Sequence, residues 1–353
     1  MKLPWAWVIW LVAVMLVLST TRNPLYLVIA ILCVVFVGLA LRRAGAEKIL
    51  PFSTWKLAVW IILLATVFNA LTSHYGETVL FTIPGHLPLV SGDVTLEALV
   101  YGATNGLILT GMLVGFMVLN MALSVRDLVS LIPRAFFPVA VVTSIAVTYL
   151  PTTVRQYHEI REAQAVRGHQ MRKLRDWLPL LMPLLVGGLE HAMQLAEAMT
   201  ARGFASAQSA KRDKETLPRV LLLVGVVLLA GGWLLQIAVS GWYGWAVMLV
   251  GGGLIGLGIW LLGSHSLRTA YRRPVLSWRD GLGILGALLV MAVFTLPIPG
   301  VGKVSLYYDP YPSLSLPLFS PVIGFVMLGL LIPGLLALNR HEGGQVDVGQ
   351  AAV

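Results

Sequence analysis

The sequence predicts an all-α, polytopic integral membrane protein: a helical bundle of about eight spans, joined to an amphipathic helical module on the cytoplasmic side. Three observations lead to this class. Of 353 residues, 58% are hydrophobic and only 12% are charged, about half the charged fraction of a typical soluble domain. The apolar residues gather in runs of membrane-spanning length, and the basic residues gather on one side of those runs.

Eight apolar runs have the length that a helix needs to cross about 30 Å of hydrocarbon, roughly 17–24 residues. None of them carries Lys, Arg, Asp or Glu near its middle, where one charge adds about 2.5–3.5 kcal/mol to the free energy of insertion. The predicted spans lie at about 5–20, 24–41, 55–72, 99–121, 219–239, 244–263, 281–297 and 318–338.

The basic residues predict the orientation of these spans. With the N-terminus inside, 23 of the 25 Lys and Arg residues fall on the inner side, and only Arg22 and Lys303 fall outside. The longest outer loop, 73–96, has no Lys or Arg. Because inner loops are enriched in basic residues, we expect both termini in the cytoplasm. The net charge of +9 is thereby explained by topology, and we expect no nucleic-acid partner.

Two stretches leave an alternative open. The 16 apolar residues 135–150 fit a ninth span, which would move the following segment outside, or an interfacial or protein-packed helix. Pro133, Pro138 and Pro151 favour the second interpretation. The first run also resembles a signal peptide, but no A-x-A cleavage site follows it, so we expect an uncleaved first helix.

Residues 152–215 form the only long stretch with the charge density of a soluble segment. It predicts one helix at about 152–167 and a second at about 183–202, with Pro179 and Pro183 marking the turn between them. The second helix is amphipathic, because apolar side chains recur at helical spacing on one side: Leu185, Leu189, Ala192, Ala196 and Met199.

Both helices end in a small or β-branched residue followed by Arg-Gly. The copies are Ala165-Val166-Arg167-Gly168 and Thr200-Ala201-Arg202-Gly203, and their arginines lie 35 residues apart. One interpretation is a helix C-cap, in which glycine adopts the left-handed conformation and arginine favours the carbonyl end of the helix dipole. The other is a docking element, since a guanidinium fixed at a capped end forms forked pairs with carboxylates. The two are compatible.

The first motif and the residues before it, Glu159 to Gly168, together with the second Arg-Gly pair resemble the transmembrane T component of energy-coupling factor transporters, which includes the cobalt-transport Q-type proteins. Asn23-Pro24-Leu25, and Asp127-Leu128 followed by Ile132-Pro133, are weaker similarities. The resemblance covers about residues 1–240.

This resemblance implies a scaffold that is not an enzyme and holds no cofactor. Two coupling helices would dock on a pair of ATP-binding-cassette ATPases, with Arg167 and Arg202 each meeting acidic residues of one ATPase. Val166, Gly168, Ala201 and Gly203 would shape these contacts. A membrane S component would capture the substrate, a vitamin or a transition-metal ion, and membrane lipid would surround the spans.

Two features depart from the family pattern. Val166 replaces the alanine that is usual in the first motif. After Arg202 this chain has four predicted spans, whereas the family typically finishes with about one. Four spans are too few for a fused S component; the extension is expected to pack against the scaffold, to bind an accessory subunit or to have another role.

Other chemistries lack support in the sequence. There is no G-x-x-x-x-G-K-[ST] loop for a nucleoside triphosphate and no H-E-x-x-H metalloprotease pattern, so we predict no catalytic residue. His74, Glu77, His86 and Asp93 share the outer loop, but their spacing is loose, and we predict no metal site. The alternative function is a membrane receptor or assembly scaffold without transport, which would also have a basic cytoplasmic docking platform.

The predicted organisation has four parts: N-terminal transmembrane helices (1–126), a cytoplasmic coupling module (127–215), C-terminal transmembrane helices (216–340) and a cytoplasmic tail (341–353). In the fourth span, the pairs Gly102/Gly106 and Gly111/Gly115 lie about 180° apart at 100° per residue. We expect this helix to be packed closely on two sides, either by neighbouring helices or as a sliding surface for a mobile S component.

Overall fold

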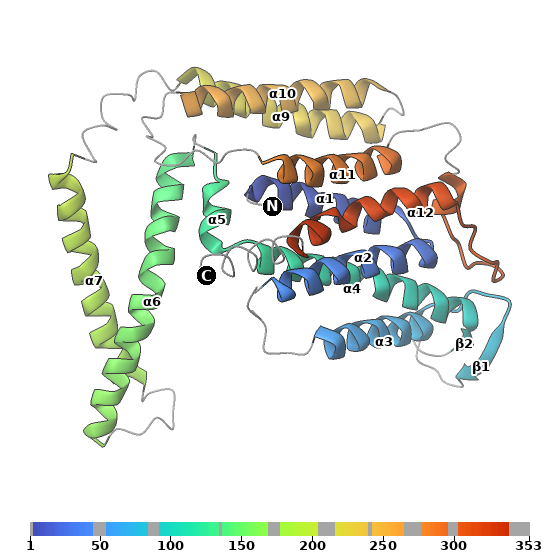
Figure 1. Cartoon of the computed structure of the whole chain (residues 1–353), viewed down its shortest axis with the longest axis horizontal. Coiled ribbons are helices and arrows are strands. Elements are labelled where there is room, and N and C mark those ends of the chain that lie inside the picture. Colours follow the sequence, from blue (N-terminus) through green and yellow to red (C-terminus); the bar gives the residue numbers. More distant parts are fainter. Residues whose placement is uncertain are drawn as a thin grey trace, which may run out of the picture. The chain divides into compact units, whose positions relative to one another are not determined.

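The computed structural model describes residues 3–44, 54–83, 92–133, 136–168, 177–203, 216–238, 242–264, 277–295 and 303–338. The chain forms two compact units (Figure 1). The first unit comprises Met1–Ser124 and Arg272–Val353, and the second is Val125–Tyr271.

The first unit contains most of the predicted spans. Its long helices are α1 (Pro4–Thr20), α2 (Pro24–Arg43), α3 (Thr54–Thr72), α4 (Leu96–Ala122) and α11 (Trp278–Thr295). A short 3-10 helix, η4 (Lys303–Leu306), comes before α12 (Pro321–Met327), which runs into a second, η5 (Leu328–Leu331). Helices α1, α2 and α12 begin with proline in the first turn, where the missing N–H has no intrahelical acceptor in any case.

Length and composition confirm a multi-pass membrane protein. Eight of the described helices are long and apolar enough to cross a bilayer, and seven of them match predicted spans. The first predicted span is a helix of 17 residues, shorter than these eight. The eighth is Leu178–Ala201, which the sequence analysis assigns to the cytoplasmic module, and that assignment stays a prediction.

Helix α4 lies in the middle of the first unit, and its glycines make the predicted close contacts on two sides. A Cβ at Gly106 would lie 2.7 Å from Cα of Ile62 in α3, and Gly102 meets the same helix. On the other side, a Cβ at Gly111 would lie 3.0 Å from the Leu18 side chain of α1. Neighbouring helices therefore occupy both glycine faces, which excludes the sliding-surface interpretation at these positions.

The C-terminal helices α11 and α12 pack against α1 and α2, so this part of the extension completes the first unit (Figure 1). Hydrogen bonds of buried side chains stabilise this contact. The Asn23 amide donates to the carbonyls of Ser305 and Leu318, both at 2.8 Å, and the Trp10 indole donates to the Leu330 carbonyl at 3.0 Å. Of the roles that the sequence left open for the extension, packing against the N-terminal helices is therefore observed for α11 and α12.

The segment between α3 and α4, which is predicted to be an outer loop, contains a β-hairpin that the sequence did not predict. Strands β1 (Val79–Ile83) and β2 (Gly92–Thr95) are antiparallel, with Ile83 opposite Gly92. The buried Glu97 carboxylate, in the first turn of α4, accepts hydrogen bonds from the backbone N–H and the hydroxyl of Thr78. These hydrogen bonds connect the residue just before the hairpin to the N-terminal end of α4.

The second unit begins with α5 (Val125–Ser130), α6 (Phe137–Val166) and α7 (Leu178–Ala201). The expected start of the first coupling helix at about 152 is wrong. Helix α6 is continuous from 137 through Pro151, so residues 137–150 form its first half and are not a separate helix. An interior proline removes one backbone hydrogen bond, and here the turns on either side hold the helix together.

The expected start of the second helix at about 183 is also wrong. Helix α7 begins at Leu178, with Pro179 in the first turn and Pro183 in the interior. Pro183 cannot donate to the carbonyl of Pro179, four residues earlier. The side-chain amide of Gln164 in α6 approaches this carbonyl at 3.5 Å. A neighbouring helix therefore supplies the donor that the proline lacks.

Helices α9 (Thr216–Ala238) and α10 (Trp242–Ser264) pack against each other as a hairpin, and glycine residues lie at their contact. A Cβ at Gly251 would lie 2.9 Å from the carbonyl oxygen of Gly225, and a Cβ at Gly232 would lie 2.9 Å from the backbone nitrogen of Met248. Small residues let membrane helices approach at backbone distance, so this pair fits two adjacent spans.

Candidate functional site

The two Arg-Gly motifs fold into the same helix cap. Arg167 follows the last residue of α6 with φ −79° and ψ 7°, and Arg202 follows the last residue of α7 with φ −83° and ψ 7°. The next residues, Gly168 and Gly203, have φ of +79° and +75°. Each glycine N–H donates to the carbonyl three residues earlier at 2.9 Å. Both motifs are therefore left-handed glycine C-caps, as the sequence predicts.

The caps expose the residues that were singled out from the sequence. Val166 is 90% exposed, and Arg167, Gly168, Ala201, Arg202 and Gly203 are all exposed. In the part of the chain that the structure describes, neither guanidinium has an ion pair or a hydrogen-bond partner. An unpaired arginine at a capped helix end can form a bidentate pair with a carboxylate of another chain.

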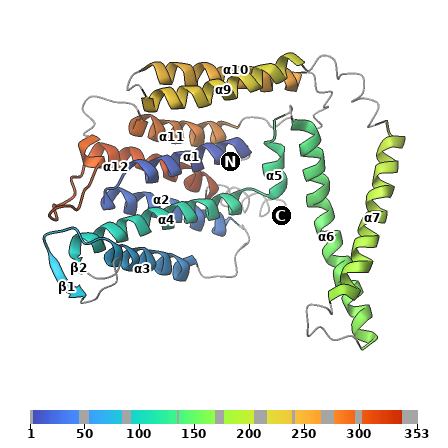
Figure 2. The ribbon, with the colours of Figure 1, turned by 180° about the vertical axis from the view of Figure 1, so that it is seen from behind.

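The structure does not bring the two caps together. Helices α6 and α7 are antiparallel (Figures 1 and 2), so Arg167 and Arg202 lie at opposite ends of the helix pair. At 1.5 Å per residue, the 24 residues of α7 separate the two ends by about 36 Å. This distance is too long for one small binding site and suits two separate contacts.

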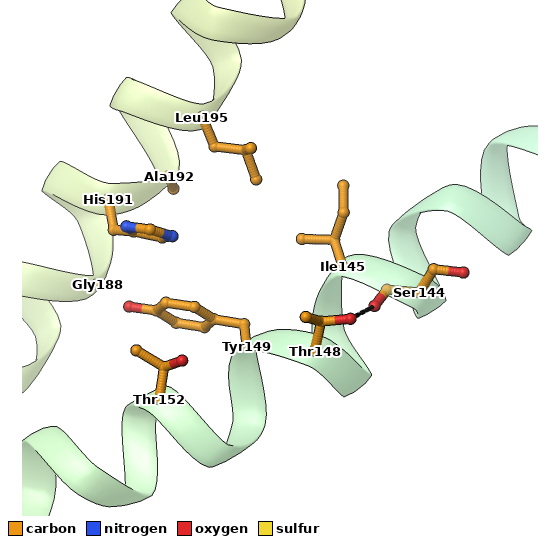
Figure 3. A pocket seen from close by; sticks show the side chains of 9 residues that line it. All are labelled: Ser144, Ile145, Thr148, Tyr149, Thr152, Gly188, His191, Ala192 and Leu195. Atoms are coloured by element: carbon orange, nitrogen blue, oxygen red, sulfur yellow. Dashed lines mark hydrogen bonds between the residues drawn. The ribbon is translucent and has the colours of Figure 1, made fainter. Parts of the chain in front are cut away.

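Two residues that sequence reasoning missed join the helices. The Tyr149 ring of α6 stacks on the His191 imidazole of α7, with centroids 4.8 Å apart and an interplanar angle of 13°. Figure 3 shows the stacked pair beside a cavity of about 430 Å³ between the helices. Only the pairing of the two helices identifies this contact, because the residues are more than 40 positions apart in the sequence.

Among the described residues, no three His, Cys, Asp or Glu side chains lie close enough together to hold a metal ion, and this includes the segment between α3 and α4. His74 Nδ1 lies 3.4 Å from the carbonyl oxygen of Asp93, whose carboxylate accepts a hydrogen bond from Thr82. His86 lies outside the described residues.

Fold and site together define a polytopic helical membrane protein with a helical module that carries two arginine-tipped ends. The family model described as cobalt transport protein (CbiQ) matches residues 3–212, more than half of the chain. The chain belongs to this family. The match includes both arginine caps and ends before α9.

Curated relatives are named energy-coupling factor transporter transmembrane protein EcfT. One from Exiguobacterium sibiricum is 33% identical over 103 residues, 26% of this chain and 39% of the relative. One from Heliobacterium modesticaldum is 29% identical over 166 residues, 44% of this chain and 61% of the relative. One from Bacillus subtilis is 26% identical over 208 residues, 52% of this chain and 78% of the relative.

This chain thus spans less than two thirds of the length of the first two relatives. The names of the relatives describe membrane subunits of transporters, which agrees with the expectation of a subunit without a catalytic site.

Proposed function

We propose that this protein is the membrane scaffold of an energy-coupling factor importer, which transmits the motion of two partner ATPases to a substrate-binding S component. The proposal rests on the two arginine caps, at the ends of α6 and α7. Two exposed arginine ends with the same cap conformation on one helix pair, about 36 Å apart, suit two copies of one type of partner surface. The substrate class that we propose is a vitamin or a transition-metal ion, taken up through the S component.

The charge pattern supports an inner-side partner. If both caps face the cytoplasm, as the distribution of Lys and Arg predicts, they stand where ATP is available. In this arrangement each ATPase presents a carboxylate to Arg167 or Arg202. When ATP draws the two ATPases together, the ends of α6 and α7 follow because their arginines are held.

Charge reversal of both arginines tests the proposal. We expect Arg167→Glu combined with Arg202→Glu to abolish co-purification of the ATPases and substrate uptake, because a carboxylate then faces a carboxylate. Arg155→Glu is the matched control, since Arg155 is also an exposed arginine of α6 but lies outside the cap, and it should leave co-purification intact. Retention of both ATPases by the double variant would refute the proposed function.

A further inference from the structure

The C-terminal extension contains a loop that lies at the predicted outer end of the first unit. Residues 307–320, here called the strap, connect η4 to α12 and form neither a helix nor a strand (Figure 1). The strap lies well beyond residue 212, where the match to the family model ends. The family match therefore assigns no role to it.

Contacts with α2 and with the end of α3 fix the strap at two points. At its tip, the Tyr311 hydroxyl lies 3.0 Å from the hydroxyl of Ser73, the residue after α3. At its end, the Ser320 N–H donates to the Tyr26 hydroxyl of α2 at 2.6 Å. The Phe319 ring stacks on the Tyr26 ring, with centroids 5.5 Å apart. The residues between these two points therefore keep a defined place at the end of the bundle.

Three leucines between the fixed points present apolar surface. Leu314, Leu316 and Leu318 are 39%, 92% and 65% exposed. The chain has no Asp, Glu, Lys or Arg from residue 310 to residue 339, so no charge in this stretch keeps the strap in water. Contiguous exposed apolar residues mark a surface that binds another apolar surface or a membrane.

The length of α2 gives the depth of the strap in the bilayer. Its 20 residues span about 30 Å at 1.5 Å per residue, which equals the thickness of the hydrocarbon core. Arg42 and Arg43 lie at the inner end of α2 and Asn23 caps the other end, so Asn23 marks the outer boundary of the hydrocarbon. The Asn23 amide donates to the Leu318 carbonyl at 2.8 Å. Leu318 therefore lies at this boundary.

The same depth follows for Leu316. Two residues of chain reach at most about 7 Å, and the interfacial layer outside the hydrocarbon is about 5–8 Å thick. The backbone of Leu316 therefore lies in the interfacial layer or deeper. Next to Asn23, the Arg22 guanidinium lies over the Tyr101 ring at 5.8 Å from its centroid, and tyrosine is enriched at this level of a membrane.

The apolar surface of the strap continues onto a predicted span. The strap leads directly into α12, which begins a helical stretch long and apolar enough to cross a bilayer. Val322 and Phe325, in the first two turns of α12, are exposed, as lipid-facing side chains of a span are. The exposed leucines of the strap therefore extend a surface whose partner is lipid.

We propose that the strap is a lipid anchor, in which Leu314, Leu316 and Leu318 insert into the interfacial layer of the outer leaflet and hold the first unit at a fixed depth. Apolar side chains that enter the boundary between headgroups and acyl chains bind proteins to membranes in this way. Because the strap is joined to α2 and to the end of α3, the anchor acts on the helices and not on the loop alone. It requires no ATPase, so it stands or fails independently of the proposed function.

Fluorescence quenching at Leu316 tests where the strap lies. Cys33, the only cysteine, is replaced by alanine, and Leu316→Cys is labelled with a fluorophore in the full chain, reconstituted in phosphatidylcholine vesicles. We expect lipid with a spin label near its headgroup to quench this label severalfold more strongly than iodide present on both sides of the membrane. Glu77→Cys is the control, since Glu77 is exposed between α3 and β1, and iodide should quench it more strongly than lipid.

Two results would overturn the anchor. Strong quenching by iodide at Leu316 would place the strap in water. Protection from both quenchers would show that a protein surface, such as a second copy of this chain, covers the leucines instead of lipid.

A charge on the strap tests whether it holds the first unit in place. Leu316→Asp adds a carboxylate, which avoids an apolar environment, and the side chain is so exposed that the fold loses little contact. The measurement is iodide quenching of a label at Leu25→Cys, an exposed position in the first turn of α2. We expect Leu316→Asp to raise this quenching at least twofold, because the outer end of α2 moves toward water.

The matched control is Leu316→Phe, which keeps an apolar side chain at the same position and should leave quenching at Leu25 unchanged. Equal quenching at Leu25 with Leu316→Asp and with the native leucine would show that the strap does not set the depth of the unit. That result would contradict the proposal.

Discussion

Replacement of Gly168 by alanine tests whether the cap conformation presents Arg167. Gly168 has φ +79°, and a left-handed conformation costs an L-residue about 1–2 kcal/mol. A Cβ at this position meets nothing within 4 Å, so the substitution adds no steric clash and its cost is that of the left-handed backbone conformation alone. If docking requires the capped end, this cost of about 1–2 kcal/mol should lower the affinity for the ATPase roughly 5–30-fold. The affinity is measured by titrating the purified ATPase against the protein in nanodiscs.

A graded series makes this prediction specific. Asparagine tolerates the left-handed region better than other L-residues, so Gly168→Asn should lose less affinity than Gly168→Ala. Gly231→Ala is the control, since Gly231 lies inside helix α9 with nothing within 4 Å of its Cβ position, and it should leave the affinity unchanged. Equal affinities for Gly168→Ala and the wild type would refute the link between the cap and docking.

Three further predictions concern the stability of the first unit, measured as thermal unfolding of the purified protein. Asn23→Ala removes the donor of two 2.8 Å hydrogen bonds to carbonyls of the C-terminal segment. Each unsatisfied carbonyl costs about 1–3 kcal/mol, so the free energy of unfolding should fall by about 2–6 kcal/mol. An unchanged unfolding midpoint would contradict the packing of the extension on α1 and α2. Trp10→Phe leaves one carbonyl without its donor and should cost about 1–3 kcal/mol, clearly less than Asn23→Ala. Gly106→Val would force α3 away from α4, because even a Cβ lies 2.7 Å from the backbone of α3; a stable variant with wild-type unfolding would show that this contact is not made.

The sequence predicted the features that depend on local patterns. The Arg-Gly caps follow from the need for glycine at a left-handed position, and both were found with nearly equal angles at Gly168 and Gly203. The two glycine faces of α4 follow from the helical period, which set Gly102 and Gly111 on opposite sides. Seven spans follow from the length and composition of apolar runs.

The features that sequence reasoning missed depend on distant parts of the chain. Pro151 was expected to bound or break the apolar stretch before it, and Pro183 to mark the turn before the second helix, but both lie inside helices. For Pro183, the side-chain amide of Gln164 from the neighbouring helix approaches the carbonyl that the proline leaves free. The packing of α11 and α12 on α1 and α2 depends on hydrogen bonds such as that between Asn23 and Ser305, separated by 282 residues. No local pattern encodes such a pair.

Cysteine labelling at the two caps tests the central claim, that both arginine ends face the ATPases in the cytoplasm, most directly. Val166→Cys and Ala201→Cys place thiols on exposed positions beside the arginines, and the native Cys33 is buried. A membrane-impermeant maleimide should label both variants in inside-out vesicles and neither in right-side-out vesicles. Labelling in right-side-out vesicles would place the caps outside, where no ATPase reaches them, and would contradict the account.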